Sequence, residues 1–203
     1  GFFATVADTY ANAALLCVEL GDLAQAFSIA EHARARAFHD ALAARSADLS
    51  QRADTAALTL AEAQAALPED GLLLEYFTTG VLETPSEWPG EGQVAQRHRF
   101  PPARTLLFAI TRRSAQVFDL PISPNDLRPS TLDGPVERYF LGAAIRQSLY
   151  RALLAPAEPL LQGARRLYLV PHGPLHYIPF GALLASDGAA LPAPTGIADG
   201  APA

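Results

Sequence analysis

The sequence predicts an α/β protein in which a helical hairpin is followed by a sheet with further helices. Of its 17 prolines only Pro68 comes before residue 80, and the segment before Pro68 is rich in Ala, Leu, Glu and Arg, a composition that favours helix. The later part contains apolar runs of strand length: LLLEYF, TLLFAIT, AQVFDL and RRLYLV. With 203 residues, 50% of them hydrophobic, the chain is long enough to bury a core.

Helix is expected from residue 4 to residue 66, interrupted at Gly21-Asp22. Small residues at Ala14, Ala26 and Ala33 would allow the two helices of the hairpin to approach closely. The spacing of Thr59 and Glu62 predicts a capping box at the start of a short helix that reaches about Leu67. The apolar face of the first helix is expected to consist of Val6, Tyr10, Ala13, Ala14, Cys17 and Leu20.

Four strands and two further helices are expected after Pro68. The strands are 72–77, a hairpin of 105–111 and 115–120, and 165–170, the last as an interior strand with its arginines at the mouth. Residues 81–103 carry four prolines and no periodicity, so they predict a loop. A helix is expected from Pro135, with Asp133 as a possible cap, until Pro156 ends it; one or two turns over EPLLQGA and another helix from FGALLA follow. The tail from Ser186 is expected to be poorly ordered. The apolar stripe of the helix from Pro135 is Val136, Phe140, Ala143, Ala144, Leu149, Leu153 and Leu154.

Charge and composition exclude several classes of protein. Lys never occurs; up to residue 70 there are four Arg against ten acids, and after it eleven against eleven, so no basic surplus favours a nucleic-acid partner. No run of 18 apolar residues and no signal peptide is found, so we expect a cytoplasmic protein without a membrane partner. The single Cys17 suits a reducing compartment. Because Met is absent even at position 1, the chain is expected to be a piece of a longer protein.

The helical hairpin resembles one tetratricopeptide (TPR) repeat. The similarity rests on Tyr10, Ala13, Ala14 and Cys17 in the first helix and Ala26, Ala30 and Ala33 in the second. Phe38 stands where the repeat pattern ends in Pro, so the second helix is expected to continue toward Arg45 as the last repeat of an array. Because one repeat cannot bury its own apolar face, further repeats are expected before it.

The segment LYRALLAPAEPLLQGARRLYLVPHGPLHYIPFGALL closely resembles the CHAT-domain family, bacterial relatives of caspases and separase that commonly follow TPR repeats. LPEDGLLLEYFTTG is similar to the first strand of that domain, and LLFAITRRSAQVFDLP to the hairpin that follows. The resemblance implies a caspase-like α/β fold and a cysteine peptidase with a His/Cys dyad. In the family the catalytic His follows a later strand, and the catalytic Cys follows the strand after that. Neither of these two segments occurs in this sequence. The chain is therefore expected to hold the N-terminal half of the domain and to be inactive alone.

These comparisons predict three parts: residues 1–45 as the TPR-like hairpin, 46–70 as a linker helix, and 71–203 as the N-terminal part of a CHAT domain. The leading hypothesis is a fragment of a TPR-CHAT protein, a cysteine endopeptidase regulated through its repeats, with a polypeptide substrate or protein partners. The alternative is a protein-protein interaction scaffold without chemistry. A small-molecule hydrolase is weakly supported because no G-x-S-x-G elbow is present.

No catalytic, cofactor-binding or metal-ligating residue is assigned from the sequence, and no cofactor is expected. Each polar candidate has a structural interpretation that is favoured over the functional one. His172 and His176 lie in a proline-rich turn, which suits a corner of the fold better than a metal site or the border of an active site. For Trp88 and Phe100, anchoring a partner and pinning the loop to the core are equally favoured. The remaining assignments are Cys17 in the core, His32 and His39 on a solvated face, Arg34, Arg36 and Arg45 with Glu31 and Asp40 on a charged helix surface, and Arg112 and Arg113 in a solvated turn.

Overall fold

The computed structural model describes residues 2–45, 57–81, 101–127 and 142–185, with side chains from residue 7 to residue 39 in the first of these ranges. The chain begins with the predicted hairpin, helix α1 (Phe2–Glu19) and helix α2 (Leu23–Arg45). Gly21 makes the turn with a φ of 76°, a conformation that favours glycine. The Asp22 side chain accepts a hydrogen bond from the Gln25 N–H and so caps α2.

Small residues bring the two helices together, as expected. Ala14, Ala26 and Ala30 are completely buried, whereas Ala33 is only partly buried. The predicted apolar face of α1 was wrong in part, because Leu20 lies beyond the last turn and is 74% exposed. The face that is buried turns toward both α2 and the sheet, and it contains Ala11, Ala14 and Leu15.

Helix α4 (Leu60–Ala66) begins with the predicted capping box. The Thr59 hydroxyl accepts the Glu62 N–H, and the Glu62 carboxylate accepts the Thr59 N–H at 2.8 Å. The other end of α4 is capped from the β hairpin, since Arg112 donates to the carbonyl oxygens of Ala65 and Leu67. The short helix is thereby tied to the sheet at both its packing face and its C-terminus.

The sheet has four strands in the order β3-β2-β1-β4. Strand β1 (Gly71–Thr79) pairs antiparallel with β2 (Arg104–Thr111), which pairs antiparallel with β3 (Ala115–Leu120). Strand β4 (Arg166–Val170) pairs parallel with β1. The strands were predicted within one or two residues. The interior position expected for β4 is not seen in the described sheet, where β4 is an edge strand.

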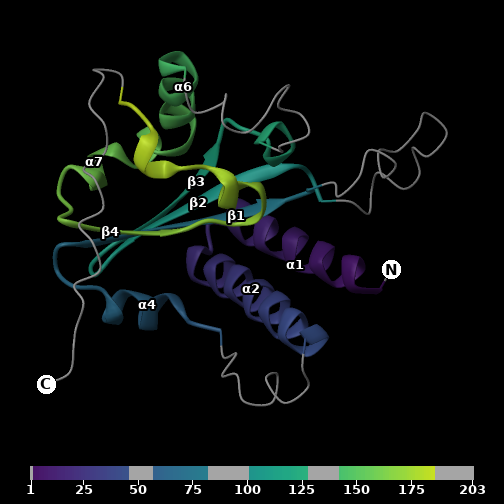
Figure 1. Ribbon diagram of the computed structural model, residues 1–203. Helices are drawn as coiled ribbons and strands as arrows, with labels where there is room; N and C mark the ends of the chain where they lie inside the picture. Colours follow the sequence, from purple (N-terminus) through teal and green to yellow (C-terminus); the bar gives the residue numbers. More distant parts are fainter. Residues whose placement is uncertain (1, 46–56, 82–100, 128–141, 186–203) are drawn as a thin grey trace, which may run out of the picture.

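Helices cover both faces of this sheet (Figure 1). On one face α1, α2 and α4 bury Phe77, Leu106, Phe108 and Ile110. On the other face the segment from α6 onward covers the alternate residues, among them Leu72, Leu74 and Tyr76. Because the hairpin and the sheet share one apolar cluster, the predicted TPR-like part packs directly on the predicted CHAT part.

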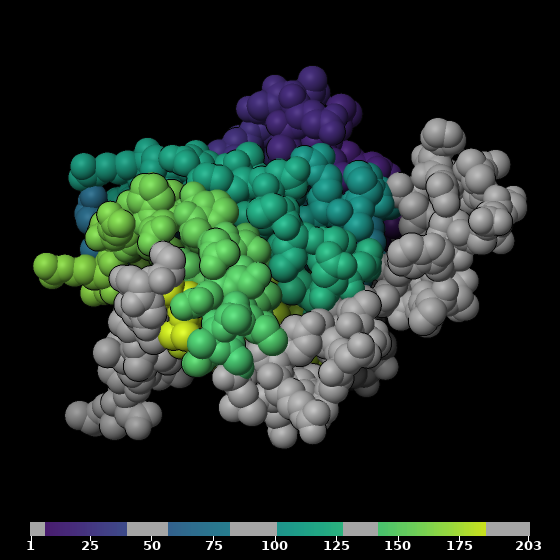
Figure 2. Space-filling view, turned by 90° about the horizontal axis from the view of Figure 1, so that it is seen from above, coloured from purple at the N-terminus to yellow at the C-terminus, as the bar shows by residue number. Residues whose placement is uncertain are grey.

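The second face is built by helix α6 (Ala143–Leu153), the 3-10 turn η4 (Ala155–Ala157) and the short helix α7 (Glu158–Leu161). Figure 2 views the molecule from this side, where residues 142–185 lie over the strands. Ala143 and Ala144, expected in the apolar stripe of α6, are exposed, whereas Leu149, Leu153 and Leu154 are buried as predicted. The Tyr76 hydroxyl donates to the Leu153 carbonyl oxygen at 3.0 Å and fixes α6 to β1.

Two 3-10 turns follow β4: η5 (Gly173–Tyr177) and η6 (Phe180–Ala182). The α-helix expected from FGALLA is therefore a single 3-10 turn within the described residues. Most of the loop 81–103, the helix start at Pro135 and the tail from Ser186 lie outside the described residues, as do Trp88 and Phe100. The three-part division of the chain stays a prediction.

Candidate functional site at the carboxyl ends of β1 and β4

The parallel strands β1 and β4 end at the same edge of the sheet, the edge at which ligands bind in open α/β sheets. Their last pair is Glu75 with Val170, after which Pro171 leads the chain away. Beyond that pair, among the described residues, the Tyr76 carbonyl oxygen and the Thr78 N–H are not bonded to β4. Two side chains take them instead: Arg34 donates to the Tyr76 carbonyl oxygen, and His172 accepts the Thr78 N–H.

His172 is held by Thr78 in one protonation state. Its Nδ1 accepts the Thr78 N–H at 3.1 Å and lies 2.7 Å from the Thr78 hydroxyl. Because the backbone N–H can only donate, Nδ1 carries no proton and the neutral ring is protonated at Nε2. Burial lowers the pKa of His172 to about 4, helped by the positive charges of Arg34 and His176. The imidazole also lies against the Phe77 ring, with centroids 5.1 Å apart.

Gly173 allows this contact. Its φ is 55°, and a Cβ there would stand 2.7 Å from the Thr78 Oγ1. Both the backbone conformation and the close approach therefore need glycine. The PHG sequence thus works as a corner that lays the histidine ring against the end of β1, in agreement with the structural interpretation of the turn.

Arg34 and Glu31 were predicted on a charged helix surface, and this prediction was wrong. Both face the sheet, where Arg34 lies 3.2 Å from Glu75 Oε1 and 3.4 Å from Glu31 Oε1. The Glu75 side chain is 4% exposed, so the cation compensates a carboxylate that is buried in the apolar interface. The charges are at the interface because Glu75 lies on the same face of β1 as Phe77, the face that the helices cover.

The pair is close in distance but poorly aligned for hydrogen bonding. Within the part of the chain that the structure describes, neither Glu75 Oε1 nor Arg34 Nε has a hydrogen-bond partner, although both atoms are buried. Burial raises the pKa of Glu75 to about 8; Arg34 opposes the rise, and the neighbouring Glu31 carboxylate adds to it. The cluster of Arg34, Glu75 and Glu31 therefore joins helix α2 to strand β1. The ion-pair contacts within the cluster offset only part of the desolvation cost of burying these groups.

The other candidates from the sequence are not brought to this edge by any contact of the described residues. Cys17 is partly buried and packs against the apolar cluster between the hairpin and the sheet. Among the described residues, no hydrogen bond joins its thiol to His172 or His176. His176 is exposed on η5, and the exposed His32 contacts the Ser28 carbonyl oxygen on its own helix.

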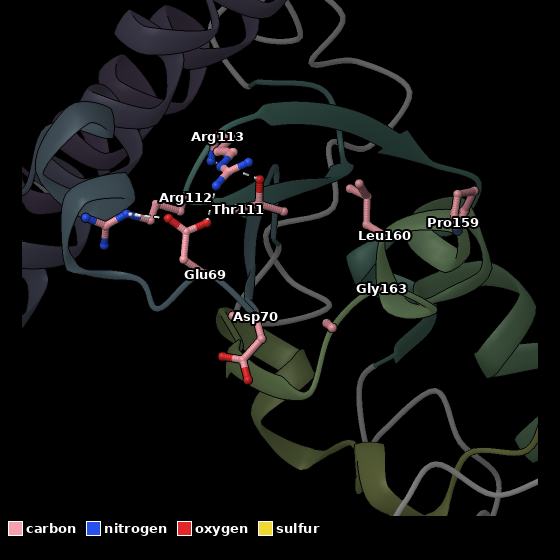
Figure 3. Close-up of a pocket in the computed structure, with 10 residues that line it drawn as sticks. Glu69, Asp70, Thr111, Arg112, Arg113, Pro159, Leu160 and Gly163 are labelled. Atoms are coloured by element: carbon pink, nitrogen blue, oxygen red, sulfur yellow. Dashed lines mark hydrogen bonds and ion pairs between the residues drawn. The ribbon is translucent and has the colours of Figure 1, made fainter.

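A pocket of about 290 Å³ lies at the opposite end of β1 (Figure 3). It is formed by Glu69 and Asp70 before β1, the hairpin turn at Arg112 and Arg113, and residues of α7 and the turn after it. Its charged groups already compensate one another, since Arg113 lies 2.8 Å from Glu69 and Arg112 caps α4. A substrate-carboxylate clamp would need these arginines to be available, so the structural interpretation of the turn fits better.

Among the described residues, no group of three or more His, Cys, Asp or Glu side chains is placed to hold a metal ion. Within the same residues, no helix has the length and apolar character needed to cross a bilayer.

Comparison with known families gives a match to part of the chain. The family model of the CHAT domain matches residues 144–196, the segment that contains almost all of α6 together with α7, β4 and the turns η5 and η6. The resemblance to the CHAT-domain family is thereby confirmed for this segment. The match does not reach the helical hairpin, and its TPR-like character stays a prediction. No curated protein and no solved structure matched the chain.

Arg34, Glu75 and Thr78 are the members of the site that sequence reasoning missed. One signal was present, because Glu75 interrupts the apolar run LLLEYF and a carboxylate in a buried strand calls for a cation. Which of the fifteen arginines supplies that cation depends on the packing of α2, which sequence periodicity does not define.

Proposed function

We propose that this chain is part of a TPR-CHAT protein, a caspase-like cysteine endopeptidase that is regulated through its repeats. The observation that carries the proposal is the CHAT-domain match over residues 144–196, on a segment that places β4 parallel to β1. The free edge of β4 within the described sheet leaves room for further strands of such a domain.

The chemistry then depends on residues beyond the 203 of this chain. In a cysteine peptidase the thiolate attacks the peptide carbonyl carbon, and the imidazole takes the thiol proton and returns it to the leaving amine. Cys17 packs in the apolar cluster and His172 is held neutral by Thr78, so neither is proposed for the dyad. The described part of the chain supplies scaffold, and the substrate is a polypeptide.

The alternative is a protein-protein interaction scaffold without chemistry. The sequence that follows Ala203 in the gene distinguishes the two. A histidine and then a cysteine after strand-like runs support the peptidase; their absence supports the scaffold.

If that cysteine exists, its replacement by Ala in the longer protein is expected to abolish peptide hydrolysis, whereas Cys17→Ser is expected to leave the rate unchanged. Cleavage of a peptide library is the measurement. Hydrolysis that survives the first variant, or is lost in the second, contradicts the proposal.

A further inference from the structure

One side chain of the helical hairpin reaches the backbone at the end of β1. The Arg34 guanidinium uses Nη2 for both the Tyr76 carbonyl oxygen, at 3.2 Å, and Glu75 Oε1, also at 3.2 Å. Nη1 faces Glu31 on its own helix, at 3.4 Å. Of these three contacts, the one to the Tyr76 carbonyl oxygen is a hydrogen bond, and the two carboxylates lie at ion-pair distance.

The groups that Arg34 and His172 hold are neighbours along one edge of β1. Backbone groups of residues i and i+2 in a strand face the same neighbouring strand, so the Tyr76 carbonyl and the Thr78 N–H both point to the side where β4 has ended. On that side, side chains replace the ladder: Arg34 from α2, then His172 from the turn after β4. Withdrawal of Arg34 would free the Tyr76 carbonyl directly beside the Thr78 contact.

We propose that Arg34 is a positioning residue that fixes the end of β1 and, through Thr78, the ring of His172 and the turn Gly173–Tyr177. The placement of α2 thereby sets the geometry of the sheet edge at which β1 and β4 end. The inference goes beyond the proposed function: it rests on contacts within this chain and holds whether the parent protein hydrolyses peptides or only binds partners.

The test uses the 203-residue chain with two variants and two controls. Arg34→Met removes the cation but leaves Glu75 buried alone, which endangers folding. The double variant Arg34→Met/Glu75→Leu replaces the pair with apolar side chains of similar size, so that no carboxylate is left alone at position 75. Glu31, whose side chain is 14% exposed, loses its cation in both variants, and both lack the donor to Tyr76. Arg36→Met changes an exposed arginine on the same helix, and Glu75→Gln removes the carboxylate charge while Arg34 remains.

Two signals are read in each variant: amide hydrogen exchange at Thr78, with Leu107 of the interior strand β2 as the reference for global opening, and the imidazole ¹⁵N resonances of His172. In the double variant we expect Thr78 to exchange on the order of tenfold faster relative to Leu107. The His172 signals should move from the pure Nε2–H form toward a tautomer mixture. Both controls should leave both signals unchanged.

The proposal is overturned if the folded double variant leaves either signal unchanged. It is equally overturned if Thr78 loses protection only as much as Leu107 does, because Arg34 would then contribute to global stability without positioning the strand end. A change of either signal in Arg36→Met would also contradict it.

Discussion

Arg34 Nη2 lies 3.2 Å from Glu75 Oε1, across the interface between helix α2 and strand β1. The two side chains are 26% and 4% exposed, so the pair is buried on the strand side and reaches solvent on the helix side. This one contact places a charge pair inside the apolar cluster that joins the hairpin to the sheet. It is also the contact from which the first two predictions follow.

Breaking the pair should destabilise the fold, whereas replacing it should not. Above about pH 8, where Glu75 is ionised, Arg34→Met is expected to lower the free energy of unfolding by about 3 kcal/mol, because it leaves a buried carboxylate uncompensated. Arg34→Met/Glu75→Leu is expected to lie within about 1 kcal/mol of the wild type. Urea unfolding measures both, with Arg36→Met as the exposed control. A double variant less stable than Arg34→Met would show that the pair is strongly stabilising, against this account.

Glu75 should make the fold less stable as the pH rises. The pKa of its carboxyl is about 8 in the folded chain against an ordinary 4.5, so the folded state binds this proton more tightly than the unfolded state. Its contribution to stability is complete below pH 4.5 and is lost as the pH rises to about 8, with a slope of at most about 1.4 kcal/mol per pH unit. Unfolding of wild type and Glu75→Gln at a series of pH values isolates this slope as a difference. If the difference in free energy of unfolding between wild type and Glu75→Gln did not change with pH, burial would not raise the pKa of Glu75 in the folded chain.

His172 should act in the opposite direction. Its folded pKa of about 4 lies below the ordinary 6.5, so the unfolded state binds the proton more tightly. The stability from this group is complete above pH 6.5 and is lost as the pH falls toward 4. Compared with His172→Gln, the wild type should therefore lose stability on acidification through this window. The Glu75 effect has the opposite sign, so the pH dependences that the two groups give to the free energy of unfolding should largely cancel between pH 4.5 and 6.5. Between pH 6.5 and 8, only the loss of stability from Glu75 should remain.

Gly173→Ala should disrupt the corner that holds His172. The substitution strains a residue with a φ of 55° and puts a methyl group 2.7 Å from the Thr78 Oγ1, so we expect a loss of about 1–3 kcal/mol in the free energy of unfolding. Gly181→Ala is the matched control, because nothing lies within 4 Å of its added Cβ and its φ is not positive. Equal stabilities for the two variants would refute the role given to Gly173.

Much of the fold was predictable because local signals agreed with packing. The hairpin break at Gly21, the Thr59 capping box and the strands 115–120 and 166–170 follow from turn chemistry and apolar runs. The position of β4 at the edge of the described sheet was not predictable, because an apolar run gives a strand but not its neighbours. The burial predicted for Leu20 and Ala143 was wrong, because helical spacing alone does not say where a helix ends or which side of it faces the core.

The site was predictable only in part. His172 and Gly173 stood out in the PHG turn, and their structural role as a corner agrees with the contact to Thr78. The Arg34 contact could not be foreseen, because Glu31 and Arg34 are also spaced as an ordinary surface pair on one helix turn. Only the tertiary packing of α2 on β1 separates a surface pair from a buried one.

The most direct test of the central claim is to locate the reactive cysteine with a peptidyl electrophile and mass spectrometry. If the proposed function holds, we expect Cys17 to stay unlabelled in the 203-residue chain. In a longer protein that contains the dyad, we expect the label on a cysteine beyond Ala203, with loss of peptide hydrolysis. Stoichiometric labelling of Cys17, with hydrolysis that depends on it, would contradict the account.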